Sequence, residues 1–570
     1  MKGGLYARLF CAIYCFFALY MVQYQSYEKE LPNSERGWKI QMSRTDLPRA
    51  ATPEDVGVYA DVVEQFIDYI QKEQLEFHSL MVLRHGKVAA EWYNEPFDAN
   101  TKHTMYSVSK SFTATAVGFA VTEGLLSLDD VVTDFFPDYP PRTPHEYFQK
   151  MTVRTLLTMT SGKQTDMMAN KGKIDWVEDF INSPWVFEPG TEYLYVNENI
   201  YMLCAILHRV TKMSVIEYLT PRLFQPLGIE TPFWETDPNG VEAGGWGLYI
   251  TTEDLAKFAD CYLHEGKYRG RRVIPKTWAQ EATKNQIGDI RMPSEDPDCN
   301  SGYGYCFWMN ATQIPSYRAD GMFSQFAINF PQLDASVITT AAIPVEAQAR
   351  AAIWKFFPYA FFNENTEKKP LQIEPTQIDR PAVSPRSMLE KKIEGRTIKV
   401  RKKILLNLIG FPMSMLPLAV TFMMSDRAGN IDNIRFRFKE HECSITWDEG
   451  DENNTVACGM DGHFRYGTMT LGKTAFKVCA NAVWLDEINL KISIRPIETI
   501  GKRELNFLFR RKDRVTITPT STPSTYKICD SLVVNLKEVI KNPLLSRAAQ
   551  FLIRFAPPLA EPKHYGKFID

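Results

Sequence analysis

The chain has 570 residues, of which 45% are hydrophobic, 23% charged and 12% aromatic. This length exceeds what one compact core needs and favours two or three domains, and the aromatic content argues against extensive disorder. The net charge of −3 creates no basic field, so nucleic acid is not an expected partner.

The N-terminal segment differs from the rest of the chain. Lys2 and Arg8 precede an apolar run at 9–22, and no acidic residue occurs before Glu28. A basic start before a short apolar run is typical of a secretory signal, although the run is shorter than the ~20 residues of a spanning helix. We expect residues 1–27 to be a signal peptide or signal anchor; a buried helix of the fold is the alternative. The protein would then be exported, and secreted or held at the membrane through residues 9–22.

The next part of the chain, residues 28–365, alternates strand-like and helical patterns. Apolar residues between positions 54 and 72 recur at helical spacing, and two apolar runs around His85-Gly86-Lys87 predict a β-hairpin. Helical patterns follow at 107–123, 151–162, 198–214 and 251–266, then three antiparallel strands within 302–342 and a closing helix within 342–361. Because strands open and close this region, the order predicts an α+β domain: one antiparallel sheet completed by both ends, with a helical lobe between them.

The remaining third of the chain reads as a separate domain. A polar, proline-bearing linker is expected at 366–390, a β-rich domain (a barrel or curved sheet) at 391–545, and a tail at 546–570. The apolar stretch 404–424 has the length of a membrane span. Prolines interrupt it and strands follow it, which favours buried strand or interface material.

Cysteine and histidine spacing gives no sign of a metal site. Neither CxxC nor HExxH occurs, so no metal is expected. The pairs Cys299/Cys306 and Cys443/Cys458 are close in sequence and could be bridged in an exported protein.

The start of the helical run at 107–123 brings two reactive groups together. Ser107 and Lys110 are three residues apart, so on a helix they lie on one face. A serine hydroxyl needs an adjacent base to act as a nucleophile, and a lysine serves as that base only when burial or a neighbour lowers its pKa. Taken alone, the pair is weak evidence, and a helix-capping serine followed by a solvated lysine is the favoured interpretation.

Three further motifs follow Ser107-x-x-Lys110 in order. They are Tyr195-Val196-Asn197, the glycine-rich Gly244-Gly245-Trp246-Gly247, and Ala319-Asp320-Gly321 before a strand. With the phrase "LLTMTSG" at 156–162, this set resembles the serine β-lactamase and penicillin-binding-protein superfamily, specifically its class C-like serine hydrolase and esterase branch. The resemblance covers about residues 51–361 and implies a β-lactamase/transpeptidase-like fold.

The resemblance also implies roles for individual residues. Ser107 would be the acylated nucleophile, with Lys110 as its proton acceptor and Tyr195 as the second acid/base. Asn197 would orient Lys110 or donate to a substrate carbonyl. The oxyanion would lie between the backbone N–H groups of Ser107 and Met322, directly after the third motif. A tyrosinate beside a lysine ammonium is plausible, because each charge supports the other.

The third motif departs from the family pattern. Members that bind β-lactams carry Lys-Thr-Gly and many esterases carry His-x-Gly, whereas this chain has Ala319-Asp320-Gly321. No cation at position 319 can hold a substrate carboxylate, and Arg318 should face the opposite side of the strand. Gly321 is retained, as close backbone approach requires. Asp320 either favours a cationic or amino-bearing substrate or is a turn aspartate that caps local N–H groups.

The function expected from these residues is hydrolysis of an ester or amide bond through an acyl-enzyme on Ser107, without a metal or organic cofactor. The substrate would be a small-molecule or peptide-like carbonyl compound. Two alternatives are a non-catalytic binding or scaffold protein that keeps the fold, and a penicillin-binding D-peptidase.

Overall fold

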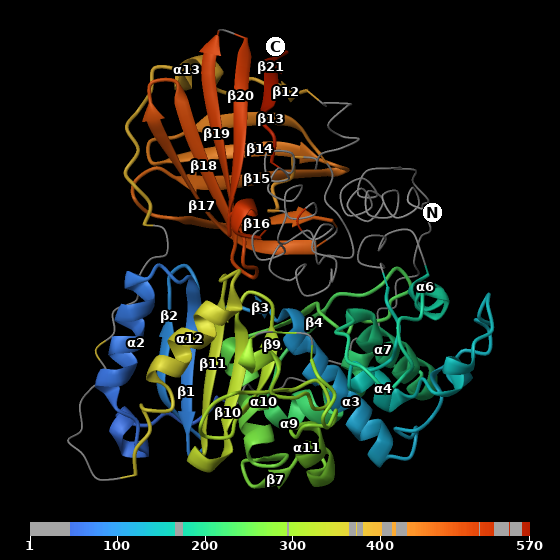
Figure 1. Cartoon of the computed structure of the whole chain (residues 1–570). Helices are drawn as coiled ribbons and strands as arrows, with labels where there is room; N and C mark the ends of the chain where they lie inside the picture. The colour runs from blue at the N-terminus through green and yellow to red at the C-terminus, as the bar shows by residue number, and fades with distance from the viewer. Residues whose placement is uncertain are drawn as a thin grey trace.

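The structure is a computed structural model in which residues 46–165, 175–292, 296–363, 380–401, 413–417, 430–528 and 561–569 are described, apart from 473 and 512, together with positions 294, 372 and 547. The expected signal segment and most of the stretch 404–424 lie outside these residues. Within the described part of the chain, no helix has the length and apolar character needed to cross a bilayer. The described residues form two domains, one above the other (Figure 1).

The first domain is built on a six-stranded antiparallel sheet in the order β2-β1-β11-β10-β9-β8. Its strands are β1 (Phe77–Arg84), β2 (Lys87–Tyr93), β8 (Trp308–Met309), β9 (Tyr317–Gly321), β10 (Gln325–Phe330) and β11 (Ala335–Ala341). The early strand β1 pairs with the late strand β11, with Val82 opposite Val337. Both ends of the domain therefore complete one sheet, as the order of patterns predicted. The segment 302–342 contains the four strands β8 to β11 instead of the three expected from the sequence.

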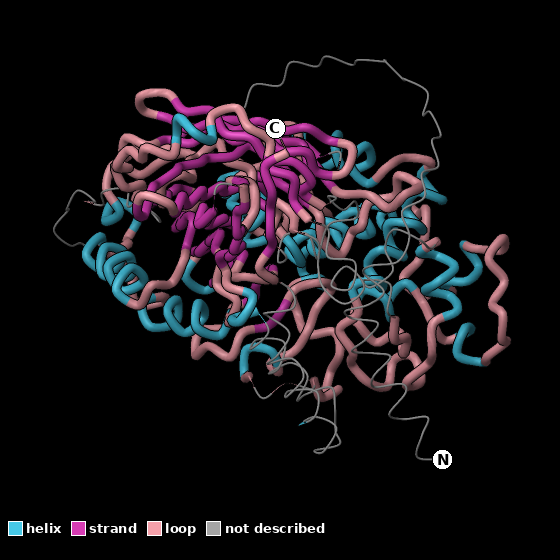
Figure 2. Tube along the Cα trace, turned by 90° about the horizontal axis from the view of Figure 1, so that it is seen from above, coloured by secondary structure: helices cyan, strands magenta, loops and turns pink. Residues whose placement is uncertain are grey.

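Helices cover both faces of this sheet (Figures 1 and 2). On one face, α2 (Ala60–Lys72) and α12 (Glu346–Phe356) pack against Leu80, Val82 and Phe326. On the other face lie α3 (Ser109–Thr122) and α10 (Thr252–Leu263), whose Ala259 carbonyl accepts a hydrogen bond from Asn329 on β10. This bond fixes α10 on the sheet.

The helical lobe lies beyond α3. Its α-helices are α4 (Val153–Leu157), α6 (Trp176–Asn182), α7 (Asn197–Thr211), α8 (Val215–Leu219), α9 (Gln225–Leu227) and α11 (Lys276–Ala282). Its short 3₁₀ and π turns are η3 (Val132–Phe135), η4 (Glu146–Gln149), η5 (Thr220–Phe224) and η6 (Pro297–Cys299). A three-stranded sheet is formed by β3 (His103–Thr104), β5 (Leu248–Ile250) and β4 (Phe233–Trp234). A two-stranded sheet is formed by β6 (Lys267–Tyr268) and β7 (Arg271–Arg272). The turns η1 (Pro53–Val56) and η7 (Pro331–Leu333) flank the main sheet.

Small residues allow α3 to run through the middle of this domain. Twelve of its fourteen residues, from Ser109 to Ala120, are buried. At Gly118 an added Cβ would lie 2.3 Å from the ring of Trp278, so the helix packs directly on the indole. A helix buried on all sides is held in place from every direction, which suits a segment that carries reactive groups at its start.

The C-terminal domain is a ten-stranded sheet that closes on itself. The strands run in the order β15-β14-β13-β12-β21-β20-β19-β18-β17-β16, and an extra parallel contact joins β15 to β17. They are β12 (Ile398–Val400), β13 (Ile431–Phe438), β14 (Glu442–Glu449), β15 (Glu452–Gly459), β16 (Arg465–Leu471), β17 (Thr474–Asp486), β18 (Asn489–Pro496), β19 (Lys502–Arg511), β20 (Arg514–Thr522) and β21 (His564–Phe568), preceded by α13 (Glu390–Ile393). The separate β-rich domain is confirmed and is a barrel.

Two details of this domain differ from the sequence-based expectations. Strand β21 lies within the expected tail 546–570, yet it pairs with both β12 and β20 and closes the gap between them. The seven described cysteines after the N-terminal segment are free thiols. Cys443 and Cys458 do lie opposite each other on β14 and β15. The position of β21 depends on pairing between strands that are distant in the chain, which no local pattern predicts.

A buried ion pair joins the two domains. Arg495 of β18 donates to Glu76, just before β1, at 2.8 Å, and the two side chains are 4% and 17% exposed. Burial by itself raises the pKa of the Glu76 carboxyl, but Arg495 and His78 outweigh it and lower the pKa to about 2. Close by, the amide of Thr104 donates to the carbonyl of Glu498 at 2.9 Å. The barrel therefore contacts the short strand that leads to Ser107.

Replacing Arg495 with alanine is expected to lower the free energy of unfolding by about 3 kcal/mol, because the carboxylate of Glu76 would stay buried without its cation. Urea unfolding of the full chain at pH 7 measures this. The control is Arg209→Ala, which breaks the exposed pair with Asp138 and should cost less than about 1 kcal/mol. Equal losses in the two variants would contradict a structural role for the interdomain pair.

Candidate active site

Ser107 and Lys110 meet where β3 turns into α3. Ser107 is in the 3₁₀ turn η2 (Tyr106–Val108), and Lys110 lies in the first turn of α3. The Lys110 ammonium nitrogen, Nζ, lies 2.8 Å from Ser107 Oγ. The three-residue spacing thus places the two groups in hydrogen-bond contact, as the sequence predicted.

The surroundings of Lys110 favour its neutral form. Its side chain is 1% exposed, and Nζ also donates to Asn197 Oδ1 at 2.7 Å and to the Gly245 carbonyl at 2.6 Å. These hydrogen-bond partners of Nζ are a hydroxyl, an amide oxygen and a backbone carbonyl, none of which carries a negative charge. Burial therefore lowers the pKa of Lys110 from 10.5 to about 7. A lysine with this pKa can accept a proton at neutral pH.

Tyr195 approaches the same serine from the loop before α7. Its ring centroid is 4.8 Å from Lys110 Nζ. Burial raises the pKa of Tyr195 well above its usual value of 10, and the nearby Ser107 hydroxyl offsets only part of this effect. The pair is therefore a neutral phenol beside a readily neutralised amine. This differs from the tyrosinate and ammonium pair considered from the sequence, because burial disfavours both charges.

Glycines let two backbone segments approach the reactive groups. At Gly245 an added Cβ would lie 2.8 Å from the Asn197 carbonyl, and this packing brings the Gly245 carbonyl to Lys110. At Gly321, the last residue of β9, an added Cβ would lie 2.4 Å from the carbonyl oxygen of Met105. Met105 precedes Ser107 by two residues, so the end of β9 lies directly beside the serine turn.

Gly321→Ala is expected to reduce kcat/KM for an ester substrate by a factor of order ten to a hundred. The new methyl group must push β9 away from Met105, and displacements of about 1 Å near reacting groups have effects of this size. Steady-state hydrolysis measures the change. Gly467→Ala is the matched control, since its Cβ would meet open space in the barrel domain. If both variants keep full activity, the close approach of β9 is not needed for turnover.

Asp320 has a different environment from the turn cap considered from the sequence. It lies in β9 rather than in a turn, and its carboxylate accepts a hydrogen bond from Arg318 Nε at 2.6 Å. Arg350 lies 3.9 Å from the same oxygen. Asp320 is therefore partnered by guanidinium groups and does not cap backbone N–H groups. Residues 318 and 320 share one face of the strand, whereas Ala319 faces the other side.

Sequence reasoning missed the role of Trp308 in this site. Its ring stacks on Tyr195 with centroids 5.7 Å apart, and the Arg318 guanidinium lies 5.6 Å from its centroid. The tryptophan is partly exposed on the edge strand β8. Nothing in the spacing indicated this contact, because 113 positions separate the two rings and only the folded sheet joins them. Within the described residues, no cluster of three His, Cys, Asp or Glu side chains is arranged to hold a metal ion.

Comparisons with known proteins agree with this architecture. A family model described as "Beta-lactamase" matches residues 61–356. The 6-aminohexanoate-dimer hydrolase of Paenarthrobacter ureafaciens is 23% identical over 331 residues, covering 52% of this chain and 80% of that protein. Protein flp of Staphylococcus aureus (strain MW2) is 26% identical over 322 residues, covering 49% of this chain and 61% of flp.

Among solved structures, a D-stereospecific amidohydrolase from Streptomyces sp. aligns with a TM-score of 0.42 and 17% identity, covering 53% of this chain and 99% of that one. The family match carries the assignment, because it spans more than half of the chain and includes the serine turn, the tyrosine loop and the closing strand. The protein accordingly belongs to the beta-lactamase family, within the serine β-lactamase and penicillin-binding-protein superfamily of hydrolases.

Proposed function

We propose that this protein is a serine hydrolase that cleaves an ester or amide bond through an acyl-enzyme on Ser107. The observation that carries the proposal is the contact between Ser107 Oγ and a buried lysine amine whose pKa is about 7. Burial also lowers the pKa of Lys163, but the amine of Lys163 donates to backbone carbonyls, whereas the amine of Lys110 contacts a serine hydroxyl whose proton it can accept near neutral pH.

The first step is acylation. Ser107 Oγ attacks the substrate carbonyl while its proton moves to the neutral amine of Lys110. The carbonyl oxygen becomes an oxyanion, which the N–H groups of Ser107 and Met322 stabilise. The first N–H groups of a helix have no acceptor within it, so the amide of Ser107 is available for this role. Tyr195 gives its proton to the leaving oxygen or nitrogen, and the Lys110 ammonium replaces it.

The second step is deacylation. A water molecule attacks the acyl carbon while its proton passes to the neutral amine of Lys110, either directly or by relay through the Tyr195 hydroxyl. Collapse of the second oxyanion then breaks the bond to Ser107 Oγ, which takes the proton back from the Lys110 ammonium. The products are a free acid and a regenerated serine. We further propose that the substrates are small-molecule or peptide-like carbonyl compounds.

β-Lactams are not the substrates that this site favours. Position 319 is a buried alanine, so no cation stands there to hold a ligand carboxylate. The next side chain, Asp320, adds a negative charge that Arg318 already partners. Substrates without a carboxylate next to the cleaved bond suit such a site better.

Covalent labelling tests the proposal against its two alternatives. A fluorophosphonate probe should label the wild type at Ser107, and Ser107→Ala should lose the label. A fluorescent penicillin should label little or none of the protein. Rapid, stoichiometric penicillin labelling would instead support a D-peptidase. Absence of labelling by either probe would support a non-catalytic scaffold.

A further inference from the structure

The three residues that connect β9 and β10 have an unusual backbone. Phe323 and Ser324 follow Met322 with φ angles of +64° and +74°, both in the left-handed region that L-residues disfavour. Two such residues in succession do not hold their conformation by themselves. Something in the surrounding structure must fix this loop.

The side chain of Gln325 supplies much of that restraint. It is fully buried, and its Nε2 lies within hydrogen-bond distance of the carbonyls of Met322, Phe323 and Ala341, at 3.1, 3.1 and 2.8 Å. Its Oε1 accepts from the amide of Ala341 at 3.1 Å. One side chain thus ties the loop to β11, in the middle of the sheet.

Two other contacts complete the restraint. The amide of Phe323 donates to Glu346 Oε1 at 3.1 Å, and the amide of Ser324 donates to the carbonyl of Gly321 at 3.1 Å. A trans peptide carries its C=O and N–H on opposite sides. Because Ser324 holds the Gly321 carbonyl inside the loop, the N–H of the same peptide, which belongs to Met322, points out of the loop.

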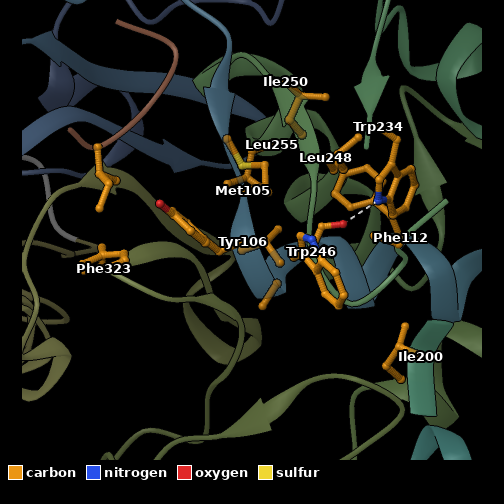
Figure 3. Packing of buried hydrophobic residues seen from close by; sticks show 14 of the residues in the cluster. Met105, Tyr106, Phe112, Ile200, Trp234, Trp246, Leu248, Ile250, Leu255 and Phe323 are labelled. Carbon is orange, nitrogen blue, oxygen red and sulfur yellow. Dashed lines mark hydrogen bonds between the residues drawn. The ribbon is translucent and has the colours of Figure 1, made fainter. Parts of the chain in front are cut away.

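The loop also touches the serine turn. The rings of Phe323 and Tyr106 lie 5.3 Å apart, with Tyr106 next to Met105 (Figure 3). Tyr106 itself has a φ of +45° and directly precedes Ser107. Tyr106 precedes the proposed donor Ser107, and Phe323 follows the other proposed donor, Met322. Both residues have left-handed backbones, and their rings pack on each other.

We infer that Gln325 is a positioning residue: its side-chain amide holds the loop 321–324 so that the N–H of Met322 faces the oxyanion formed on Ser107. This inference rests on the proposed acyl-transfer function. Gln325 touches neither the substrate nor the reacting atoms. Its effect is confined to the transition state, since the oxyanion exists only there.

The test compares two amide-to-acid changes in the same strand. Gln325→Glu keeps the shape of the side chain and the oxygen that accepts from the Ala341 amide. It replaces the donor Nε2 with an oxygen, which then faces the three carbonyls. The control is Asn329→Asp, because Asn329 is also buried on β10 but donates to Ala259 and Tyr317 instead of the loop. Gln325→Met, which is neutral and of similar length, is the second variant in case the acid does not fold.

Gln325→Glu or Gln325→Met should lower kcat for a p-nitrophenyl ester by about a hundredfold, the size seen when one oxyanion donor is lost, with KM changed less than threefold. Fluorophosphonate labelling of Ser107 should slow in parallel, and the pH midpoint of kcat/KM should not move, because Lys110 is untouched. Asn329→Asp should keep its kcat even if its Tm falls equally.

The inference is overturned if folded Gln325 variants keep the wild-type kcat, or if Asn329→Asp loses as much kcat as they do. A wild-type protein that neither hydrolyses the ester nor takes up the probe would instead defeat the proposed function, and the inference with it. The wild-type measurement therefore tells the two failures apart.

Discussion

Ser107→Ala is expected to reduce hydrolysis of short p-nitrophenyl esters to the background rate, a loss of order a hundredfold or more. Removing Oγ leaves Lys110 and Tyr195 in place but takes away the atom that forms the acyl bond. Tyr195→Phe should lose activity by a similar factor, because the leaving group then lacks its proton donor. Initial rates of the purified chain from Glu28 onward, followed by release of nitrophenolate, measure both effects.

The two variants differ in how they should react with the covalent probe. Tyr195→Phe keeps the nucleophile and should still be labelled at Ser107, though more slowly, whereas Ser107→Ala should not be labelled at all. Circular dichroism checks that each variant is folded. If all three proteins hydrolyse the ester at one common rate, Ser107 is not the nucleophile for that substrate.

The pH profile of kcat/KM should rise through a midpoint near pH 7. Lys110 acts as a base only when its amine is neutral, and burial lowers its pKa to about 7. Below this pH the amine is protonated and cannot accept the proton of Ser107, so activity falls as pH decreases. Measurements from pH 5.5 to 9 with a neutral ester, whose own charge does not change, give the midpoint directly.

Lys163 offers a matched control for this profile. Burial also lowers its pKa to about 7, but its Nζ donates to the carbonyls of Ile181 and Ser183 and lies 3.8 Å from the ring centroid of Trp185. Lys163→Gln should therefore leave the midpoint unchanged in the folded protein. A flat profile in the wild type would show that the protonation of Lys110 does not control activity. A midpoint that shifts in Lys163→Gln would assign the pH dependence to Lys163 instead of Lys110.

Much of the fold was predictable because its signals are local. The hairpin around His85-Gly86, the helix after Ser107 and the helix within 251–266 all depend on residues within a few positions of one another. The barrel was predictable as a β-rich domain from short alternating strands. Its closure was not, because strand β21 comes from a stretch whose sequence has no strong strand pattern and finds its place only between β12 and β20.

The sequence by itself determined that a serine and a lysine share one helical turn, since that contact needs only the geometry of adjacent turns. The tertiary structure alone decided their chemistry. Asn197 and Gly245 reach Lys110 from 87 and 135 positions away. A pKa depends on water exclusion summed over all these surrounding segments. The structure also decided the environment of Asp320. Its partner Arg318 is only two positions away, but the strand geometry that puts both side chains on one face, together with burial, makes them an ion pair.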